Sequence, residues 1–309
     1  MAAAMTQAAE HDDSRAARMH VPVLVAEVCG MAAASAPREI VDATVGTAGH
    51  AGALLRATGA RLLGLDRDAG ALAVAAERLA EFSARVTLRQ ANFANLAVVM
   101  AEVGFQSAGA ILADLGMSSF ALEDPARGFS FRLDGPLDMR MDRDAPLRAY
   151  DILNEESEEE IARVIYQYGE ERASRRIARG IVAARRRRPL TTTAELRAIV
   201  ERALGAHRRA GAHPATRTFQ ALRIAVNQEM ESLAALLADG PNLLAPGGRM
   251  MVIAYHSLED RAVKERFREL VRGGEFIAVT RKAIKPSAAE VAENPRARSA
   301  RLRCIERSA

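Results

Sequence analysis

Small and acidic residues follow the first two predicted strands in an arrangement that suits a nucleoside-containing ligand. Asp42, Gly46 and Gly49 come directly after the first short apolar run, and Asp66 ends the second. Small residues let backbone amides approach a ligand at the positive N-terminal end of the next helix. A carboxylate at the end of the second strand is placed to accept hydrogen bonds from ribose hydroxyls. These residues predict a nucleoside cofactor without choosing between a dinucleotide and S-adenosylmethionine; the alternative is a tight turn followed by a helix capped by Asp68.

Chemistry is expected where the fourth predicted strand ends, because open α/β sheets bind ligands at the carboxyl edge of their strands. Asp114, Gly116, Ser118 and Ser119 follow that strand and offer a carboxylate and two hydroxyls as hydrogen-bond partners. The alternative for the carboxylate and the hydroxyls is helix capping. Phe93 follows the third strand, where its ring would pack against an adenine or belong to the core.

The fifth predicted strand delivers Tyr255, His256 and Ser257 to the same edge. His256 has no sequence partner at the spacing of metal ligands, so no metal site is expected there. Ser257 lacks the Gly-x-Ser-x-Gly elbow of a hydrolase, which makes that reaction a poor option. His256 is therefore a candidate catalytic residue without a metal.

Apolar runs that alternate with amphipathic stretches would position these residues. Short buried strands are predicted at 40–41, 62–65, 86–88 and 110–112. Helical stretches such as 69–81 lie between them, and strands separated by helices form a parallel, doubly wound sheet. The pattern returns later as a helix at 228–237, a turn at 245–249 and a strand at 250–255. The sheet is therefore predicted to be split in the sequence.

A region of different composition interrupts this pattern. Residues 124–144 are rich in Gly, Pro, Asp and Arg, which is typical of an ordered loop. Helical spacing of apolar residues follows over 158–182, and Thr192 with Glu195 forms a capping box that begins another helix. The predicted parts are a disordered tail at 1–19, an α/β domain formed by 20–121 and 212–309, and a mainly helical insert at 122–211.

The composition of the 309-residue chain is that of a globular protein, with 49% hydrophobic and 27% charged residues. Two cysteines exclude a disulfide scaffold and fit a reducing cytosol, so a cytoplasmic location is expected. No apolar run is long enough for a membrane span, and the first 19 residues lack the apolar stretch of a signal peptide.

Arginines concentrate in the second half of the insert. Between positions 172 and 209 the chain carries 12 arginines against two glutamates. Such a surplus favours a phosphate backbone as partner, because neutralised phosphates release condensed counterions. The alternative is a solvated helical face in an arginine-biased composition, since only three of the 43 basic residues are lysine.

Longer motifs, spread over about 20–307, carry a resemblance to one family. The matching segments are Asp42-x-Thr44-x-Gly46-x-x-Gly49-His50, Asp114-Leu-Gly116-x-Ser118-Ser119, Arg127-Gly-Phe-Ser-Phe131, Gly135-Pro-Leu-Asp-Met-Arg-Met-Asp142, Tyr168-Gly-Glu-Glu-Arg172, His213-Pro-Ala-Thr-Arg-Thr-Phe-Gln220, His256-Ser-Leu-Glu-Asp-Arg261 and Glu293-Asn-Pro-Arg-Ala-Arg-Ser299. The chain resembles the bacterial ribosomal RNA small-subunit methyltransferase H family, also called MraW.

The resemblance implies a class I, S-adenosylmethionine-dependent methyltransferase fold, which is Rossmann-like, with an inserted helical domain. It implies N4-methylation of a cytidine in the decoding region of 16S ribosomal RNA, with the RNA or the small ribosomal subunit as partner. Carried over by position, the cofactor contacts fall on Ala48, Gly49, His50, Asp66, Phe93, Asp114 and Ala121. A homodimer is compatible with the sequence.

Two of these positions depart from the family pattern. The family usually has glycine where this chain has Ala48, and glutamine where it has Ala121. The extra methyl of Ala48 is harmless if its φ is negative. The lost amide at Ala121 removes one polar contact, typically worth about 0.5–1.5 kcal/mol. At most, weaker cofactor binding is expected.

The implied reaction needs a hydrogen-bond acceptor, because the lone pair of the cytosine amine is delocalised into the ring. An acceptor draws on the amine hydrogens while the nitrogen attacks the methyl group in line. Asp114, Ser118 and Ser119 are the candidates, and Asp114 could hold the cofactor instead. The base must also leave its stack, and Tyr255, Phe129 or Phe131 could clamp it.

The expected RNA cradle consists of arginines of the insert and the segment after it. They are Arg175, Arg176, Arg179, Arg185, Arg186, Arg187, Arg188, Arg217 and Arg223, with Arg296 and Arg298 near the C-terminus as further members. Three other readings compete. One is a methyltransferase on another substrate. The second is a non-catalytic RNA-binding or ribosome-assembly protein, suggested by Ala48 and Ala121. The third, a nicotinamide dehydrogenase, is disfavoured because the loop lacks a clean Gly-x-Gly-x-x-Gly.

Overall fold

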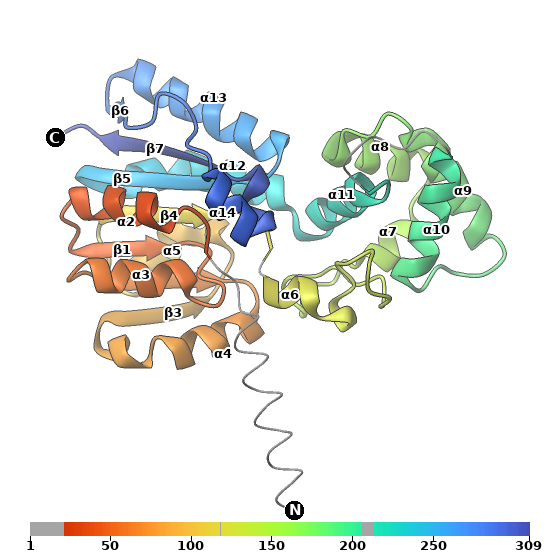
Figure 1. Ribbon diagram of the computed structural model, residues 1–309, viewed down its shortest axis with the longest axis horizontal. Helices are drawn as coiled ribbons and strands as arrows, with labels where there is room; N and C mark the ends of the chain where they lie inside the picture. Colours follow the sequence, from red (N-terminus) through yellow and green to blue (C-terminus); the bar gives the residue numbers. More distant parts are fainter. Residues whose placement is uncertain (1–21, 118, 206–212) are drawn as a thin grey trace, which may run out of the picture.

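The computed structural model describes residues 22–117, 119–205 and 213–309. The predicted disordered tail at 1–19 lies outside these ranges. The described chain forms one seven-stranded sheet with helices on both faces, and a second, helical body beside it (Figure 1).

The sheet has the strand order β3-β2-β1-β4-β5-β7-β6. The strands are β1 (Glu39–Asp42), β2 (Arg61–Asp66), β3 (Val86–Gln90), β4 (Ala108–Asp114), β5 (Leu244–Ala254), β6 (Phe276–Ala278) and β7 (Arg301–Arg307). Strands β1 to β5 pair in parallel, whereas β7 pairs antiparallel with both β5 and β6. The prediction of a doubly wound, mostly parallel sheet split in the sequence is confirmed. The predicted turn at 245–249 is wrong, because those residues already belong to β5.

Alternating apolar side chains of the strands cover the two faces of the sheet, as the two-residue period of a strand requires. Ile40, Leu62 and Leu112 pack with α2 (Val25–Ala34), α3 (Gly49–Ala57) and α4 (Ala69–Arg78) on one face. Their neighbours Val41 and Ile111 pack on the other face with α5 (Leu96–Glu102), α12 (Glu229–Asp239) and α13 (Ser257–Gly273). Strands buried on both faces read as nearly continuous apolar runs, which explains why they could be predicted.

Strand order reverses between β1 and β4, because the chain adds β2 and β3 on one side of β1 and returns to the other side for β4. Ligands of open α/β sheets bind at such a switch point, beyond the carboxyl ends of the strands. The fold therefore brings the ends of β2, β1, β4 and β5 to one edge.

A separate apolar core holds the helical body together, on the right of Figure 1. Its helices are α7 (Ala149–Glu155), α8 (Glu158–Gly169), α9 (Ser174–Arg185), α10 (Thr193–Leu204) and α11 (Thr216–Asn227). The predicted capping box is present at the start of α10, where Thr192 and Glu195 satisfy each other's backbone amides. The predicted boundary assigns α11 to the α/β part, although α11 packs within this helical core. The division into domains stays a prediction.

The helical spacing over 158–182 covers two helices rather than one. Helix α8 ends at Gly169, the following Glu170 has a left-handed backbone with φ 49°, and α9 begins at Ser174. Glutamate rarely adopts that conformation, so nothing in the sequence indicated that a helix ends here. The helical spacing of apolar residues continues past this point. None of the described helices combines the length and apolarity needed to cross a membrane.

Candidate functional site

Three carboxylates end three adjacent strands of the sheet. Asp66 ends β2, Asp42 ends β1 and Asp114 ends β4. Tyr255 follows β5, directly beside β4. The structure thus brings together residues that the sequence predicted at one edge, from strands up to 213 positions apart.

Asp114 is held at both carboxylate oxygens and at its backbone amide. The Tyr255 hydroxyl donates to Asp114 Oδ1 at 2.8 Å, and His50 Nδ1 lies 3.4 Å from Asp114 Oδ2. The Asp114 amide donates to Thr44 Oγ1 at 2.7 Å. Its side chain is 11% exposed, so little bulk water competes with these contacts. Tyr255 therefore supports the carboxylate, and its hydroxyl hydrogen is already used in this hydrogen bond.

Asp42 lies beneath the loop that follows β1. One of its oxygens accepts the Thr44 amide at 3.2 Å, whereas the buried Oδ2 has no hydrogen-bond partner among the described residues. Burial raises the pKa of Asp42 to about 7, and the charge of His50 opposes that rise. Asp42 is therefore an orphaned acceptor beside the other carboxylates.

Asp66 binds the turn and the helix that surround the expected cofactor. Its oxygens accept the amides of Gly46 and Asp68, both at 2.9 Å. Burial raises the pKa of Asp66 as well. Each carboxylate oxygen has two lone pairs, so these contacts leave acceptor capacity for ribose hydroxyls.

The loop between β1 and α3 contains a strained residue. Ala48 caps α3 with φ 68° and ψ 25°, and its side chain is buried. The condition for a harmless methyl, a negative φ, is therefore not met. A non-glycine residue in this region costs about 1–2 kcal/mol. Gly49 and His50 then begin α3, with the His50 ring buried beneath the loop.

The other carried-over cofactor positions have mixed surroundings. Phe93 follows β3 and packs, half-buried, against the α5 side of the core. Ala121 lies in the short helix α6 (Ser119–Glu123) and is buried in the core of the helical body. Ser118 lies outside the described residues, and the structure does not describe the side chain of Ser119.

Sequence reasoning missed Phe120, which lies between those serines and Ala121. It is 38% exposed, and its Cε1 atom would lie 3.3 Å from a Cβ placed on Gly70 at the start of α4. Helix α6 therefore reaches across to the helix that follows Asp66. The only sequence signal was an aromatic residue next to the serines.

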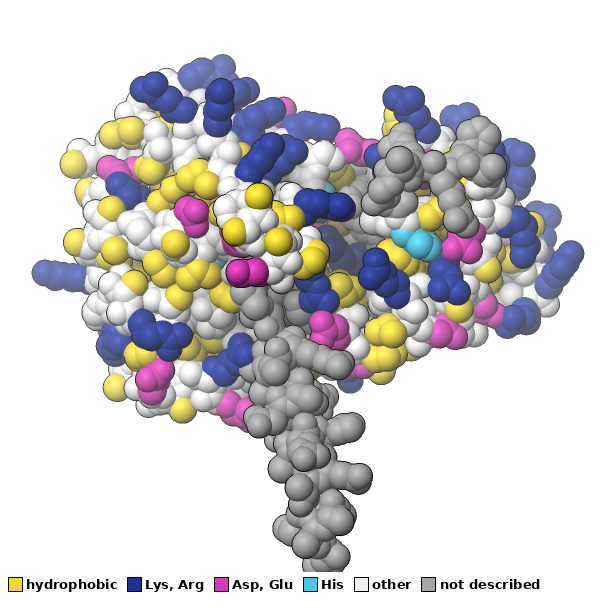
Figure 2. All heavy atoms as spheres, in the orientation of Figure 1, with side chains coloured by type: hydrophobic (Ala, Val, Ile, Leu, Met, Phe, Trp, Pro, Cys, Tyr) yellow, Lys and Arg dark blue, Asp and Glu magenta, His cyan; other side chains and the backbone are white. Residues whose placement is uncertain are grey.

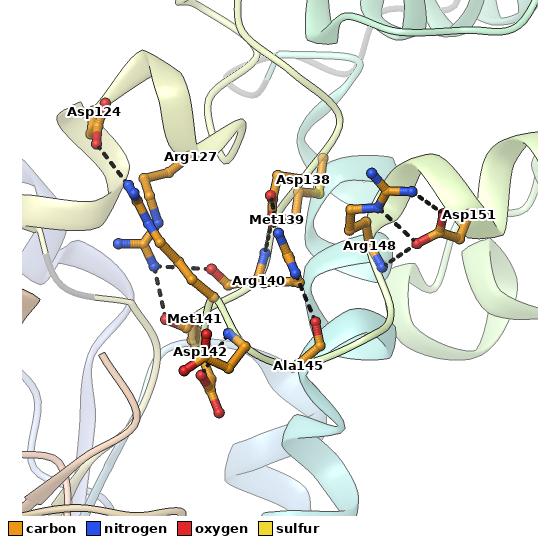
Figure 3. A network of polar contacts seen from close by, with 12 residues as sticks. Asp124, Arg127, Asp138, Met139, Arg140, Met141, Asp142, Ala145, Arg148 and Asp151 are labelled. Carbon is orange, nitrogen blue, oxygen red and sulfur yellow. Dashed lines mark hydrogen bonds and ion pairs between the residues drawn. The ribbon is translucent and has the colours of Figure 1, made fainter. Parts of the chain in front are cut away.

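Arg127 joins the loop before the helical body to the cofactor edge. Its guanidinium is buried and donates to Asp68 Oδ2 at 2.6 Å. It also donates to the carbonyls of Arg140 and Met141, both at 2.9 Å (Figure 3). Asp68 in turn caps α4 by accepting the Gly70 amide. The motifs 127–131 and 135–142 therefore form one folded loop. The sequence comparison with the family had identified both motifs but not their role as an anchor.

Asn227, at the end of α11, completes the anchoring of that loop. Its side chain donates to the carbonyl of Met139 and accepts the amide of Met141, both at 2.7 Å. Its carbonyl accepts a hydrogen bond from Arg67, which follows β2. Loop, helical body and sheet edge thus meet at a single residue.

His256 lies in a buried ionic cluster, although it has no sequence partner at the spacing of metal ligands. Ligand atoms of Glu229, His256 and Glu259 lie within 4.8 Å of one another. However, Arg223 donates to both oxygens of Glu229, at 2.8 and 2.9 Å. His256 Nδ1 accepts the Glu259 amide at 3.4 Å, as the cap of α13. The guanidinium of Arg223 therefore already neutralises Glu229, and His256 Nδ1 is used as a helix cap.

The same cluster changes the predicted roles of its members. Glu259 is 3% exposed and accepts the amide of Tyr255 at 2.8 Å. Burial opposes its ionisation, but the contacts with His256 and Arg223 are sufficient to lower the pKa of Glu259 overall. His256 therefore caps the helix after β5, and Arg223 pairs with Glu229 inside the protein; a catalytic role for His256 and an RNA contact for Arg223 stay predictions.

Two aromatic side chains of the helical body are also internal. Phe129 is 5% exposed, and Phe131 stacks on His213 with a centroid distance of 4.4 Å. Both belong to the helical core, so neither is placed as a base clamp.

The predicted arginine cradle divides into internal and exposed members. Arg185 donates to the carbonyls of Leu153 and Glu156, and Arg217 to that of Glu170, so these two arginines hold helix ends. Arg179 and Arg188 pair with Glu158 and Glu195. The members that are exposed and have no acidic partner among the described residues are Arg175, Arg176, Arg186 and Arg187.

Comparison with known proteins finds a family model and relatives that match most of the chain. The model of the MraW methylase family matches residues 17–308. "Ribosomal RNA small subunit methyltransferase H" of Symbiobacterium thermophilum is 47% identical over 304 residues, covering 93% of this chain and 96% of that protein. The protein of the same name from Methylocella silvestris is 46% identical over 318 residues, covering 97% and 91%.

Solved structures are more distant in sequence. A putative rRNA methylase from Clostridium thermocellum is 15% identical, with a TM-score of 0.42, over 87% of this chain and 88% of that one. A putative methyltransferase from Streptococcus mutans, solved in complex with SAH, is 10% identical, with a TM-score of 0.43, over 93% and 99%.

Proposed function

Because this chain belongs to the MraW methylase family, we propose that it methylates 16S ribosomal RNA on N4 of a cytidine in the decoding region, using S-adenosylmethionine. The relatives that cover nearly all of its length are named as methyltransferases of small-subunit ribosomal RNA. The choice of base and atom comes from the family resemblance of the motifs.

The charge of the edge supports S-adenosylmethionine over a dinucleotide. Within the described ranges, no lysine or arginine forms an ion pair with Asp42, Asp66 or Asp114, and one acceptor atom, Asp42 Oδ2, is buried without a partner. Carboxylates that outnumber cations in a site of low dielectric favour a positively charged ligand and repel a diphosphate. This surplus of carboxylates is the observation that carries the proposal.

The residues at the edge fit the parts of this cofactor. Asp66 would hold the ribose hydroxyls, and the loop from Gly46 to Gly49 would approach the amino-acid part with its backbone. Phe93, after β3, and Phe120, in α6, are the aromatic candidates for contact with the adenine. When bound, S-adenosylmethionine supplies a methyl group activated by the positive charge on its sulfur.

Asp114 is the acceptor best placed for the amine of the target base. It lies at the switch point, and its carboxylate is fixed by Tyr255 and His50 while keeping further lone pairs. A hydrogen bond from the amine to this carboxylate raises the electron density on nitrogen during attack. Asp114 would also take the proton that the nitrogen gives up when it receives the methyl group.

The helical body, predicted at 122–211, is proposed to recognise the RNA. Figure 2 shows dark-blue side chains along its outer surface, on the right of the view. The exposed arginines without acidic partners belong to α9 and to the turn after it. Guanidinium groups in such positions can contact phosphates without a desolvation penalty from a buried ion pair.

Reconstituted methylation tests the proposal. The purified protein is incubated with S-adenosylmethionine and small subunits from a strain that lacks its homologue, and the RNA is analysed by mass spectrometry of nucleosides. One N4-methylated cytidine in the decoding region is expected. Methylation at another atom or of another RNA would contradict the assignment.

The non-catalytic alternative rests on the strain at Ala48 and on Ala121, where the family usually has glycine and glutamine. Calorimetry with S-adenosylmethionine separates the two readings, because a protein that only assembles ribosomes has no need to bind it. Absence of binding would favour that alternative.

A further inference from the structure

On its C-terminal side, the helical body connects to the sheet through a single residue between two helices. Helix α11 belongs to the helical body and α12 covers the sheet (Figure 1). Gln228 ends α11 and precedes α12, with a left-handed backbone of φ 50° and ψ 44°. Residues at the ends of elements absorb the φ and ψ changes that let two rigid parts rotate. The orientation of the helical body therefore depends on side-chain contacts across this junction.

Glu170, the residue after α8, reaches from the helical body to α13. The Ser257 hydroxyl donates to Glu170 Oε2 at 2.6 Å, and the Arg261 guanidinium donates to Oε1 at 3.1 Å. Arg217 of α11 donates to the Glu170 carbonyl at 2.8 Å. The hydrogen bond from Ser257 lowers the pKa of Glu170 most, and Arg261 adds to this lowering against the effect of burial. Glu170 is therefore ionised, with its backbone tied to the helical body and its carboxylate bound to α13.

The backbone of Glu170 has a conformation that favours another residue type. Its φ of 49° and ψ of 32° lie in the left-handed region, which glycine usually occupies after a helix. Strain of this kind persists where the surrounding structure over-determines the conformation. Here the carbonyl and both carboxylate oxygens have donors on other helices. The contact with α13 therefore compensates for a backbone that glutamate does not favour.

The first turn of α13 joins this contact to the reacting edge. Ser257 begins α13, and Glu259 in the same turn accepts the Tyr255 amide at 2.8 Å. The Tyr255 hydroxyl in turn donates to Asp114, the proposed acceptor. A displacement of the helical body at Glu170 therefore acts on the helix whose start supports Tyr255.

Resting on the proposed function, we infer that Glu170 is a positioning residue, which holds the RNA-recognising helical body at the start of α13 so that the target amine meets Asp114. The contact joins two motifs, 168–172 and 256–261, which the family resemblance identified without a role. One motif lies in the helical body and the other follows β5 of the sheet. Their meeting is a feature of the fold and not of either motif alone.

The energetic weight of the contact lies in orientation more than in stability. The side chains of Glu170 and Arg261 are 40% and 53% exposed, and ion pairs with such exposure add little to the free energy of unfolding. A second contact across the same junction acts in the same direction, because the Tyr168 hydroxyl donates to Glu231 Oε1 of α12 at 2.8 Å. Two side chains at the end of α8 therefore fix it against α12 and α13.

Two substitutions at Glu170 separate orientation from folding. Glu170→Gly removes the carboxylate and relieves the strained backbone, so Tm should fall by no more than about 2 °C. Glu170→Gln keeps the size of the side chain but loses the ion pair with Arg261. Its matched control is Glu160→Gln on the same helix, because Glu160 pairs with Arg163 within α8 and these side chains are 34% and 55% exposed.

Steady-state methylation kinetics measure the effect on the reaction. We expect Glu170→Gly to lower kcat by about tenfold and Glu170→Gln by at least about threefold, because a misplacement of about 1 Å can cost about 100-fold in rate. The KM for RNA and the Kd for S-adenosylmethionine should stay within about threefold of wild type, since the exposed arginines and the cofactor loop are unchanged. Glu160→Gln should behave as wild type. Unchanged kcat in both Glu170 variants, or an equal loss in Glu160→Gln, would overturn the inference.

A double-variant cycle tests whether the two side chains act as one contact. Arg261→Gln should lower kcat as much as Glu170→Gln does, and the double variant should be no worse than either single variant. Losses that multiply in the double variant would show that Glu170 and Arg261 act separately, and would overturn the inference.

A distance measurement is independent of activity, RNA and cofactor. Spin labels at Ala76→Cys in α4 and Ala198→Cys in α10, both exposed positions, report the separation of the two bodies in a Cys29→Ser background. Double electron–electron resonance should give a shifted or broader distance distribution in Glu170→Gly and the wild-type distribution in Glu160→Gln. The wild-type distribution in Glu170→Gly would overturn the inference. If the distribution changes as expected but the wild-type protein does not methylate the RNA, the proposed function fails and the orienting contact stands.

Discussion

Arg127 and Asp68 form a buried ion pair of 2.6 Å that joins the loop before the helical body to the N-cap of α4. Their side chains are 4% and 11% exposed. The pair lies two residues from Asp66, so the segment that leads into the helical body is attached directly beside the expected ribose contact.

Arg127→Ala should destabilise the protein by about 3 kcal/mol or more, because it leaves Asp68 and two carbonyls without a donor in a buried place. Urea unfolding followed by circular dichroism measures this. The control is Arg143→Ala, whose ion pair with Asp124 spans 3.6 Å between side chains that are 65% and 39% exposed. That variant should change stability by less than about 0.5 kcal/mol. Equal effects of the two substitutions would show that Arg127 is not an anchor.

Ala48→Gly should stabilise the protein by about 0.5–1 kcal/mol. The left-handed backbone at φ 68° strains alanine but not glycine, and this gain exceeds the entropy that glycine loses on folding. Thermal unfolding measures the change. The matched control is Ala73→Gly, at an exposed position inside α4, which should cost about 1 kcal/mol. A destabilised Ala48→Gly would mean that the loop does not hold this conformation.

Tyr255→Phe should lower kcat about tenfold while leaving the Kd for S-adenosylmethionine nearly unchanged, because it removes the hydrogen bond at Asp114 Oδ1 and keeps the ring. Steady-state methylation kinetics and calorimetry measure the two quantities. Tyr166→Phe, at a side chain that is 63% exposed, is the control and should behave as wild type. Unchanged kcat in Tyr255→Phe would remove this contact from the catalytic arrangement.

The stability of the cofactor-free protein should decrease as pH rises through the range set by Asp42. Its pKa is about 7 in the folded protein, against an ordinary value of 3.8. A raised pKa means that the folded state binds the proton of Asp42 more tightly than the unfolded state does. The resulting contribution to the free energy of unfolding is fully present below pH 3.8 and is lost by about pH 7. Relative to Asp42→Asn, the free energy of unfolding should fall by up to about 4 kcal/mol over that range. A pH-independent difference between the two proteins would contradict this.

The double variant Arg186→Gln, Arg187→Gln should reduce the salt dependence of RNA binding. Each lost phosphate contact lowers the slope of log K against log salt concentration by about 0.7–0.9, so two contacts correspond to about 1.4–1.8. Filter binding over a salt series gives the slope. The control is Arg38→Gln, Arg89→Gln, which neutralises two exposed arginines at the ends of β1 and β3. Equal slopes for both double variants would leave the helical body without support as the RNA-binding part.

The positions of Asp42, Asp66 and Asp114 could be predicted because they follow apolar runs whose strands are buried on both faces. Parallel strands bring their carboxyl ends to one edge, so spacing in the sequence was enough to place the three carboxylates together. The capping box at Thr192 was predictable for a similar reason, since its two hydrogen bonds are local.

The contacts that fix side-chain roles were not predictable, because they join distant segments. Arg223 and Glu259 meet only when α11, α12 and α13 pack, and Arg127 finds Asp68 only across the folded loop. A single arginine in a sequence looks the same whether it faces phosphate or a buried carboxylate. The exposed and the internal members of the arginine cradle therefore had to be separated by the structure.

The late position of β5 and β7 has a consequence for biosynthesis. The buried residues of the helical core lie between positions 121 and 226, whereas the central sheet needs a strand that starts at Leu244. Domains fold as the ribosome delivers them, beginning from the N-terminus. The helical core can therefore form before β5 is available to pair with β4. Asp114 contacts Tyr255 only after most of the chain has left the exit tunnel. A nascent or truncated chain would therefore have a formed helical core before the carboxylate edge at Asp114 is complete.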